Sequence, residues 1–397
     1  MAWMVPEQDL DYEQRNFLNS HLRGGESNVW IKGHAGSGKS VLLGHSVKDA
    51  LQKRLNVAVV VYTHALIDLL RTGLAEIGIT NVPIMTYYEF KESKENYDII
   101  FVDEIQDIPS TVLKQMRNRS KRVIGAGDQL QSIYADGASP EEIRTIISGQ
   151  IVELLTIHRL TRSLIKLVSL FMANVGNILQ AKVDAISADV QIKVCNASTP
   201  QKEVKYIWTK AKSHANRIKP TAILLPKREE LLDFCDEICT LEGKGRWPRT
   251  YDHQRRRSWN NFDFNDLNSF LSQNGVQLEY VGSSYGSLDH AVKNHNTILM
   301  TYHSAKGLDF ENVFLPRLTS DFSIPTGKKK TNGRSVDQET VFMVGLTRSR
   351  NNLFLSYTGT HHHFLDKFIG DSCVASINID RELDGQTSGS TRNTPLW

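Results

Sequence analysis

Gly33-His34-Ala35-Gly36-Ser37-Gly38-Lys39-Ser40 is the stretch of this 397-residue sequence that decides the fold. It matches G-x-x-x-x-G-K-[ST], the glycine-rich loop that holds phosphate groups between a strand and a helix. Residues 28–31 before it read as a short buried strand, and residues 41–47 after it read as the opening of a helix. In such a loop the backbone N–H groups turn inward around phosphate oxygens, and the helix N-terminus adds partial positive charge.

The loop predicts ATP as the ligand, with Mg²⁺ beside it. Lys39 would reach the β- and γ-phosphates, and the Ser40 hydroxyl would bind Mg²⁺. The remaining predicted nucleotide contacts in the loop are Gly33, Ala35, Gly36, Ser37 and Gly38.

Two acids follow a second apolar run, residues 97–102, and form the natural partner of the phosphate loop. We expect Asp103 to hold Mg²⁺, directly or through water. Glu104 would orient or deprotonate the attacking water. An Asp-Glu pair after a strand means little alone, but downstream of a phosphate loop it is specific.

Strand-like and helix-like segments alternate along the chain, which predicts an α/β fold. Residues 57–61 are continuously apolar, as in a parallel strand covered on both faces. Helical residues 66–77 follow, and a further strand at 122–125 leads to Gly127 and Asp128. The second half repeats this theme, with strands at 221–225 and 297–300. The order predicts mostly parallel sheets with helices on both faces.

Composition sets broad limits on location and partners. Hydrophobic residues make up 40% and charged residues 23%, which is ordinary for a soluble globular protein, and no apolar run is long enough to cross a membrane. The N-terminus lacks a secretory signal pattern and four cysteines form no disulfide framework, so we expect a cytoplasmic protein without a membrane partner. The net charge of +3 is too mild to indicate nucleic-acid binding by itself.

Taken together and in order, the motifs resemble those of the superfamily 1 helicases of the UvrD/Rep kind. The resemblance extends to about residue 357. The matching segments are Gln14, residues 33–40, residues 62–64, residues 102–107 (D-E-x-Q-D), residues 127–134 (G-D-x-x-Q-S-I-Y), residues 301–310 (T-x-H-x-A-K-G-L-E-F, with Asp309 for glutamate) and residues 344–349 (V-A-x-T-R-A).

The resemblance implies two RecA-like lobes of the P-loop NTPase kind with ATP between them. It places lobe one at residues 1–148 and lobe two at residues 149–375. We expect the polar residues 376–397 to form a disordered tail.

The resemblance also implies roles for individual residues. Arg159 and Arg348 would come from lobe two and neutralise charge on the γ-phosphoryl group, and Gln131 would sense that group. Gln14 would read adenine, His158 stands where the family has an adenine-stacking tyrosine, and Asp309 would belong to the nucleotide site. The predicted contacts with a single strand are Tyr62, Thr63, His64, His303 and Lys306.

Three departures from the family pattern matter. The inserted domains of larger relatives are absent, and a basic segment at about 243–260 occupies the second insertion's place. This segment carries Arg255, Arg256 and Arg257 with Trp247 and Trp259, and would form either a nucleic-acid contact or a solvated loop. The adenine-stacking tyrosine is replaced by His158. Asp136 stands near the point where the family often has a DNA-stacking aromatic residue.

The leading interpretation is an ATP-hydrolysing motor on single-stranded nucleic acid, expected to be DNA, that moves 3′ to 5′ as the family does. The alternative is a regulatory ATPase subunit of a larger repair or anti-phage defence complex, with weak unwinding of its own and a partner such as a nuclease. A small-molecule phosphotransferase leaves the motifs at residues 301–310 and 339–349 unexplained.

Overall fold

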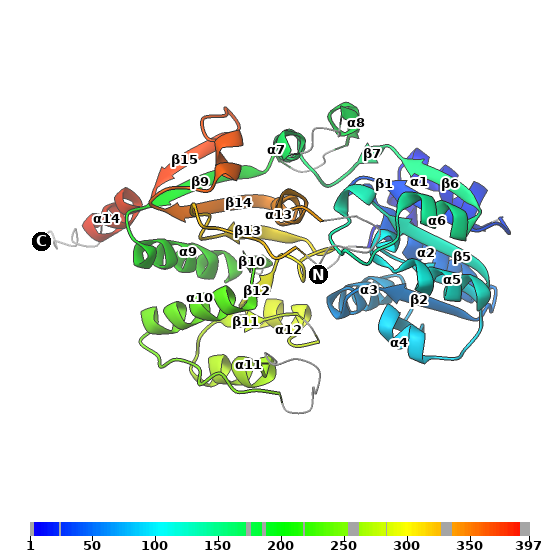
Figure 1. The fold of residues 1–397 in the computed structure, drawn as a ribbon, viewed down its shortest axis with the longest axis horizontal. Helices are drawn as coiled ribbons and strands as arrows, with labels where there is room; N and C mark the ends of the chain where they lie inside the picture. The colour runs from blue at the N-terminus through cyan, green and yellow to red at the C-terminus, as the bar shows by residue number, and fades with distance from the viewer. Residues whose placement is uncertain are drawn as a thin grey trace, which may run out of the picture. The chain divides into compact units, whose positions relative to one another are not determined.

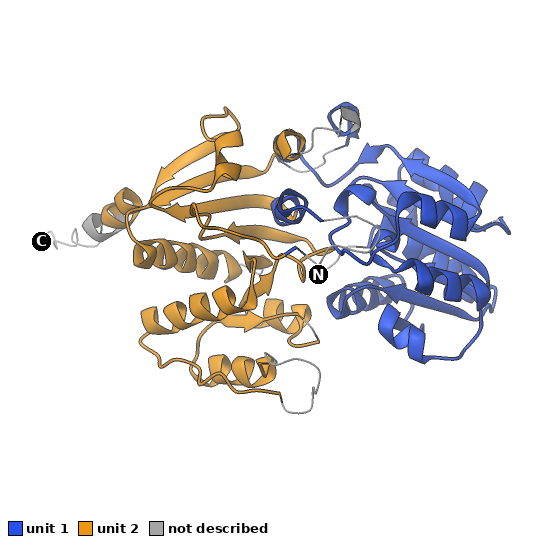
Figure 2. Ribbon diagram, in the orientation of Figure 1, with its two compact units in different colours: residues 1–165, 173–188, 326–347 blue, residues 166–172, 189–325, 348–397 orange. Residues whose placement is uncertain are grey.

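The computed structural model of this chain describes residues 4–23, 25–171, 176–184, 188–216, 219–252, 262–282, 284–326 and 336–389. Its described residues divide into two compact units. The first takes in residues 1–165, 173–188 and 326–347, and the second takes in residues 166–172, 189–325 and 348–397 (Figure 2). Each unit is built around one parallel sheet (Figure 1).

The first unit contains a six-stranded sheet in the order β3-β2-β4-β5-β1-β6. Every neighbouring pair of strands in it is parallel. The strands are β1 (Val29–Gly33), β2 (Val57–Val61), β3 (Ile84–Thr86), β4 (Tyr97–Val102), β5 (Ser120–Gly127) and β6 (Gln150–Leu154). Its helices and turns include α1 (Tyr12–Phe17), η2 (Leu18–Arg23), α2 (Lys39–Gln52), α3 (His64–Glu76), α4 (Tyr87–Glu92), η3 (Ile105–Asp107), α5 (Ser110–Asn118), η4 (Gln129–Gln131), α6 (Pro140–Ile147) and α13 (Gln338–Leu346).

Strand β2 shows why helices cover both faces of this sheet. Successive side chains of a strand point to opposite faces. Val57, Val59 and Val61 therefore pack into one apolar cluster with residues of α2 and α3. Ala58 and Val60 pack into a second cluster with residues of α5 and α6 on the other face. The continuous apolar run is the consequence, as predicted for a buried parallel strand.

The second unit contains a seven-stranded parallel sheet in the order β11-β12-β10-β13-β14-β9-β15. Its strands are β9 (Gln191–Ala197), β10 (Thr221–Leu225), β11 (Leu278–Tyr280), β12 (Thr297–Thr301), β13 (Phe310–Leu315), β14 (Ser349–Thr358) and β15 (Val374–Asn378). The helices that pack on it are α9 (Pro200–Ala215), α10 (Arg228–Leu241), α11 (Phe264–Gln273), α12 (Leu288–Lys293) and α14 (Ile379–Gly389). The α/β prediction of two RecA-like parallel sheets is thus confirmed.

The remaining short elements fall outside these two sheets. They are η1 (Glu7–Asp9), the strand pair β7 (Thr156–Ile157) and β8 (Lys182–Val183), α7 (Arg162–Phe171), α8 (Gly176–Gln180) and η5 (His363–Lys367). None of the described helices has the combination of length and apolar character that crossing a bilayer requires.

The predicted lobe boundaries differ from the observed units. Strand β6 pairs with β1, so the first unit continues past residue 148, because that strand completes its sheet. Residues 326–347, assigned to lobe two from the sequence, also belong to the first unit.

The expected disordered tail is partly ordered. Strand β15 adds to the edge of the second sheet beside β9. Helix α14 follows it directly, and Ile379 is buried in the core of the second unit. The polar composition of residues 376–389 concealed this, since only a few apolar residues, Ile377, Ile379 and Leu383, pack against the core. Residues 390–397 lie outside the described part.

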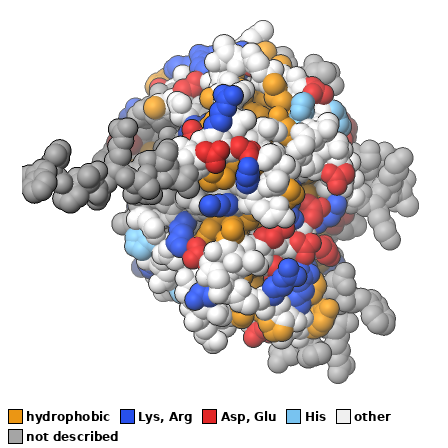
Figure 3. All heavy atoms as spheres, turned by 90° about the vertical axis from the view of Figure 1, so that its left-hand side faces the viewer, with side chains coloured by type: hydrophobic (Ala, Val, Ile, Leu, Met, Phe, Trp, Pro, Cys, Tyr) orange, Lys and Arg blue, Asp and Glu red, His pale blue; other side chains and the backbone are white. Residues whose placement is uncertain are grey.

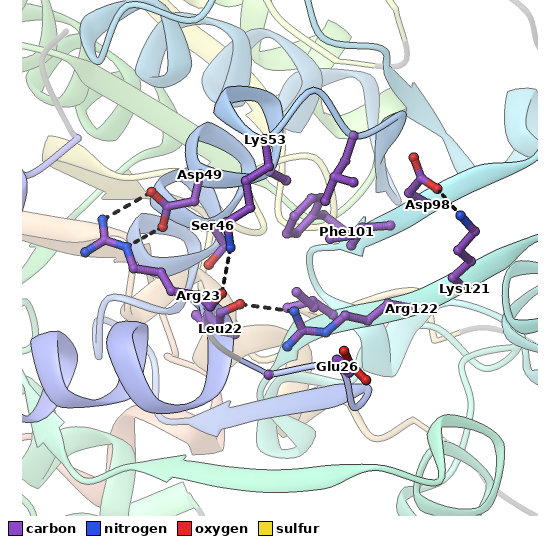
Figure 4. Close-up of a pocket in the computed structure, with 15 residues that line it drawn as sticks. Leu22, Arg23, Glu26, Ser46, Asp49, Lys53, Asp98, Phe101, Lys121 and Arg122 are labelled. Carbon is purple, nitrogen blue, oxygen red and sulfur yellow. Dashed lines mark hydrogen bonds and ion pairs between the residues drawn. The ribbon is translucent and has the colours of Figure 1, made fainter.

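A cavity of about 530 Å³ lies at the amino ends of the strands in the first unit (Figure 4). Because Gly33 ends β1, the cavity and the phosphate loop lie at opposite ends of the strands. Two ion pairs join charged groups around the cavity: Arg23 Nε lies 2.5 Å from Asp49 Oδ2, and Lys121 Nζ lies 2.8 Å from Asp98 Oδ1. We therefore regard the cavity as part of the scaffold and not as the nucleotide site.

Arg122 in the cavity wall connects β5 to the N-terminal segment. Its guanidinium donates hydrogen bonds to the carbonyl oxygens of Ser27 (2.6 Å), Leu22 (3.0 Å) and His21 (2.7 Å). Burial lowers the pKa of this side chain. A buried cation bonded to three carbonyl groups fixes the end of η2, and through it the position of α1.

Replacing Arg122 with methionine should leave three carbonyl groups without their donor. Each unsatisfied buried acceptor costs about 1–3 kcal/mol, partly offset by removal of a buried charge, so the free energy of unfolding should fall by about 2–4 kcal/mol. Urea unfolding measures this directly. Lys121→Met is the matched control, because its side chain is exposed next to Arg122 in the same strand, and its unfolding midpoint should stay near that of wild type. Equal midpoints for the two variants would contradict the role of Arg122.

Candidate nucleotide-binding site

The phosphate loop joins the end of β1 to the start of α2. Gly36 and Gly38 adopt left-handed backbone conformations, with φ of 77° and 84°, which favour glycine because side chains with a Cβ are strained there. Lys39 Nζ donates to the carbonyl oxygens of Gly33 and His34, both at 2.9 Å. The loop thus has the backbone conformation that the sequence motif requires.

Acidic side chains surround the ammonium group of Lys39. Burial lowers its pKa, while the carboxylates of Asp128, Glu104 and Asp103 act in the opposite direction. The Ser37 hydroxyl is also buried, and it has no hydrogen-bond partner among the described residues. A buried hydroxyl in a glycine-rich loop at a helix N-terminus is a donor that a phosphate oxygen would satisfy.

Asp103 follows β4 and is joined to the loop by one hydrogen bond. Ser40 Oγ donates to Asp103 Oδ2 at 2.8 Å, and Asp103 is only 4% exposed. Burial, with Glu104 as the next cause, raises the pKa of Asp103 to about 6. A hydroxyl and a carboxylate at this distance are the hard oxygen ligands that Mg²⁺ prefers, so the two predicted metal ligands lie together and fit the ion.

Glu104 has a left-handed backbone, with φ of 51° and ψ of 47°. Such a conformation costs a residue other than glycine about 1–2 kcal/mol and persists only where its surroundings enforce it. Its carboxylate accepts a hydrogen bond from Gln106 Nε2 at 2.5 Å. Gln131, on η4, donates from Nε2 to Asp128 Oδ2 at 2.9 Å. The predicted base and the predicted γ-phosphate sensor are therefore both held by side chains of the first unit.

Gln14 lies against the loop, as the prediction of an adenine-reading residue requires. A capping box with Asp11 fixes the first turn of α1: the Gln14 N–H donates to Asp11 Oδ1 at 2.6 Å, and Gln14 Oε1 accepts from the Asp11 N–H at 3.2 Å. The side-chain amide donates to the Ser37 carbonyl oxygen at 3.3 Å. A Cβ on Gly38 would lie 2.3 Å from Gln14 Nε2, so this close approach requires glycine.

His158 and Arg159 also pack onto the loop. The His158 N–H donates to the Gly36 carbonyl oxygen at 2.9 Å, and His158 Nε2 lies 2.8 Å from Asp11 Oδ2. A Cβ on Gly36 would lie 2.4 Å from the Cβ of Arg159. Arg159 was expected from lobe two. It belongs to the first unit instead, because the backbone of His158 bonds to the loop.

The second unit gathers the other predicted residues around one loop. Arg348 is 1% exposed and donates from Nη1 to the Leu308 carbonyl oxygen at 3.0 Å. Asp309 Oδ2 accepts from Arg350 Nη2 at 3.1 Å. Lys306 is 2% exposed. Burial lowers the pKa of His303, and the nearby charge of Lys306 lowers it further. Lys306 in this conformation offers little surface to a strand.

The predicted single-strand contacts of the first unit differ in what they do. Thr63 caps helix α3, accepting from the Leu66 N–H at 3.4 Å, so it has a structural role already. His64 is exposed at the first position of that helix. The Tyr62 ring stacks on Tyr134, with centroids 3.8 Å apart and planes at 23°.

Sequence reasoning did not assign several residues near Tyr62 and Glu104. The Tyr87 ring lies 5.0 Å from Tyr62 and 4.0 Å from Tyr88, and Tyr88 is 58% exposed. The run Thr86-Tyr87-Tyr88 was the available signal for these rings. The contact of Gln106 with Glu104 had no sequence signal beyond the D-E-x-Q-D pattern.

The basic segment at 243–260 is only partly described. Trp247 belongs to the core of the second unit and donates to Asp266 Oδ2 at 2.8 Å. Arg249 pairs with Asp233 at 2.7 Å and Asp236 at 3.0 Å. These two residues therefore have structural roles, because Trp247 packs in the apolar core and Arg249 pairs with two carboxylates. Arg255, Arg256, Arg257 and Trp259 lie outside the described residues. On the face drawn in Figure 3, basic and acidic side chains are intermixed.

Two protein-family models match parts of this sequence. The viral superfamily 1 RNA helicase core domain matches residues 29–216, and the UvrD-like helicase C-terminal domain matches residues 257–360. Over both of these segments the chain is therefore similar to superfamily 1 helicases.

Individual relatives match over shorter stretches. DNA helicase II of Salmonella typhimurium is 26% identical over 145 residues, which is 34% of this chain and 20% of that protein. DNA helicase II of Escherichia coli is 29% identical over 108 residues, 25% of this chain and 15% of that protein. The matches thus span about a fifth or less of these relatives. Among solved structures, the arterivirus helicase nonstructural protein 10 is similar over 88% of this chain and 64% of the arterivirus chain, with 16% sequence identity and a TM-score of 0.43.

The raised pKa of Asp103 leads to a test of stability against pH. Its value of about 6 in the folded state exceeds the ordinary value of 3.8, so the folded state binds the proton more tightly, and stability falls as pH rises from about 4 to 6. Asp103→Asn should therefore raise the free energy of unfolding of the nucleotide-free protein at pH 7.5 by about 1–3 kcal/mol.

Thermal unfolding at pH 4.5 and 7.5, in EDTA, measures the effect. The advantage of the variant should shrink at the lower pH, where Asp103 is protonated in the folded state. Asp98→Asn is the control, because Asp98 has a lowered pKa and should show the opposite sign. A variant less stable than wild type at pH 7.5 would contradict the assigned cause.

Proposed function

We propose that this chain is an ATP-hydrolysing motor that acts on single-stranded nucleic acid, with DNA as the substrate and 3′ to 5′ as the direction. The observation that carries the proposal is the 2.8 Å hydrogen bond between Ser40 and Asp103, formed beside Lys39 and Glu104 at the mouth of the phosphate loop. This arrangement supports nucleotide hydrolysis. Similarity to superfamily 1 helicases supports coupling of hydrolysis to a nucleic acid, and helicase II of Salmonella and Escherichia coli is named as a DNA helicase.

The predicted site residues of the first unit each have a part in the proposed reaction. Gln14 binds the base, the loop backbone and Ser37 bind phosphate oxygens, and Lys39 adds positive charge as negative charge develops on the transferred group. Glu104 orients the attacking water and accepts its proton. Ser40 and Asp103 would hold Mg²⁺, which supplies further positive charge to the phosphates when bound. Gln131 contacts the γ-phosphate.

The two arginines complete the proposed charge balance. Arg159, whose backbone lies against Gly36 next to His158, would contact phosphate from within the first unit. Arg348 of the second unit has the family's position for an arginine finger, a role worth on the order of 10³–10⁵ in turnover in related NTPases. The assignment of Arg348 rests on the motif, as does that of Asp309.

Lys39→Ala and Glu104→Gln should both abolish hydrolysis, by different routes. Loss of Lys39 removes charge from the phosphate site, so nucleotide affinity should fall as well. A glutamine at residue 104 still accepts a hydrogen bond from Gln106, so nucleotide should bind as in wild type while turnover falls by a factor of about 10² or more.

Measurement of ATP turnover and of binding of a fluorescent ATP analogue separates the two routes. Lys91→Ala and Glu92→Gln are matched controls on the exposed surface of α4 and should leave both quantities unchanged. Loss of nucleotide binding in Glu104→Gln would refute the role assigned to that residue. Absence of any turnover in wild type, with or without single strands, would refute the proposed function.

One observation favours a second candidate, a regulatory ATPase with weak unwinding of its own. Asp136 is exposed near the Tyr62–Tyr134 stack, where the family often has an aromatic residue that stacks on DNA. A stacked base contributes about 1–3 kcal/mol, and a carboxylate instead repels phosphate. Such a chain would grip a strand weakly and need a partner protein, such as a nuclease or a repair or defence subunit, for vigorous unwinding.

An unwinding assay with the purified chain distinguishes these candidates. We expect single strands to stimulate ATP turnover, and a 3′-tailed duplex to be unwound slowly at sub-stoichiometric protein. Asp136→Trp should increase strand affinity, whereas Asp98→Trp, at the opposite end of the sheet, should not. Rapid unwinding of a long duplex by the wild-type chain alone would rule out the regulatory candidate.

A further inference from the structure

Gln106 lies between Glu104, which the proposed reaction uses, and Asp128, which bonds to Gln131, yet neither the motifs nor the comparisons assign Gln106 a task. It belongs to η3, directly after the Asp103–Glu104 pair, and it is 0% exposed. A fully buried glutamine is uncommon and has to be hydrogen-bonded, because its amide loses several contacts with water. The partners of this amide therefore show what it does.

The two ends of the Gln106 amide bind different elements. Nε2 donates to Glu104 Oε2 at 2.5 Å, and Oε1 accepts from the Asp128 N–H at 3.2 Å. A single planar group thus connects the carboxylate after β4 to the backbone after β5. Because one end must donate and the other must accept, the amide has only one orientation that satisfies both partners.

Two glycines lie close against Gln106. A Cβ on Gly127 would lie 2.1 Å from Gln106 Oε1, and a Cβ on Gly137 would lie 2.1 Å from the Gln106 carbonyl oxygen. Gly127 therefore lies against the side-chain amide, and Gly137 lies against the backbone of the same residue, so both ends of Gln106 are closely packed. A fixed donor opposite Glu104 in turn restricts the carboxylate, whose own backbone is already in a strained left-handed conformation.

We propose that Gln106 is a positioning residue for ATP hydrolysis: it orients the Glu104 carboxylate toward the attacking water and ties it to segment 127–134. That segment carries Asp128 and Gln131, joined at 2.9 Å, and ends at Tyr134, which stacks on Tyr62. A shift of segment 127–134 on nucleotide or strand binding is thereby transmitted to Glu104. The inference rests on the proposed function, because it names how the proposed base is held.

Two variants test the proposal from different sides. Gln106→Met keeps the length of the side chain and removes both hydrogen bonds. Gly127→Ala keeps Gln106 and displaces its amide, since the new methyl group would overlap Oε1. Misplacement of a catalytic group by about 1 Å can lower turnover on the order of 10²-fold. We expect kcat to fall by about 10- to 100-fold in both variants, while the KM for ATP and the affinity for a non-hydrolysable analogue stay within about 3-fold of wild type.

The matched control is Gly125→Ala, in the same strand and two residues away. Its new methyl group would lie 2.3 Å from Ile105 Cδ1, the end of a flexible apolar side chain, and leaves Gln106 in place. Both alanine variants crowd Ile105, so general disturbance of this region affects both, whereas only Gly127→Ala reaches the amide. We expect Gly125→Ala to keep kcat within about 3-fold of wild type.

The assay uses the full chain, well below the melting temperature of each variant, with and without a single-stranded oligonucleotide. A fall in kcat with retained nucleotide affinity, in Gln106→Met and Gly127→Ala but not in Gly125→Ala, supports the proposal. Unchanged kcat in both test variants, or a parallel loss of kcat and nucleotide affinity, overturns it while the proposed function stands. A wild-type chain that hydrolyses no ATP overturns the proposed function, and this inference falls with it.

Discussion

The hydrogen bond from Ser40 Oγ to Asp103 Oδ2 joins the two halves of the nucleotide site, and the rest of the first unit is arranged around it. It requires that β1 and β4 end at the same edge of the sheet, which parallel strands achieve when helices return the chain to the other edge. It also requires a buried carboxylate, whose desolvation is unfavourable. Lys39 offsets part of that cost, because its charge lowers the pKa of Asp103 against the effects of burial and Glu104. The site is therefore a balance of opposed buried charges rather than a set of independent ligands.

Local patterns were enough to predict the elements that carry this site. The apolar run at residues 57–61 has the same first and last residue as strand β2. Its five consecutive apolar residues are typical of a strand with both faces covered. Lys39, Ser40, Asp103 and Glu104 were assigned to the proposed nucleotide site from spacing, because a loop, a helix start and a strand end are all local features. Gln14 followed from the family order, and the structure places its amide against the loop.

Features that depend on distant packing were not predictable in this way. Strand β6 is mostly exposed because it lies at the edge of its sheet, and only its pairing with β1 shows which unit it belongs to. Helix α14 has a mostly polar sequence in which Ile379 and Leu383 pack against the core, so composition indicated disorder. Trp247 resembled a base-stacking residue beside arginines, yet its indole is in the core. Arg159 was assigned to the other lobe from its motif, whereas a backbone hydrogen bond from His158 to Gly36 decides its place.

Charges buried in each unit connect stability to function. Asp103 in the first unit and Arg348 in the second are both almost fully buried, and desolvation of such ions costs more than apolar side chains of the same volume would. Neither unit gains stability from keeping them. A bound nucleotide reverses the balance, because a ligand that binds only the folded chain stabilises it by mass action. Asp103 also interacts with Lys39 and Glu104, so a bound nucleotide would change the electrostatic environment of the residues proposed for hydrolysis. In the proposed motor, which would release its nucleotide in every cycle, a site that is costly to maintain when empty has a use, and polar and charged side chains would then occupy positions where packing alone favours apolar ones.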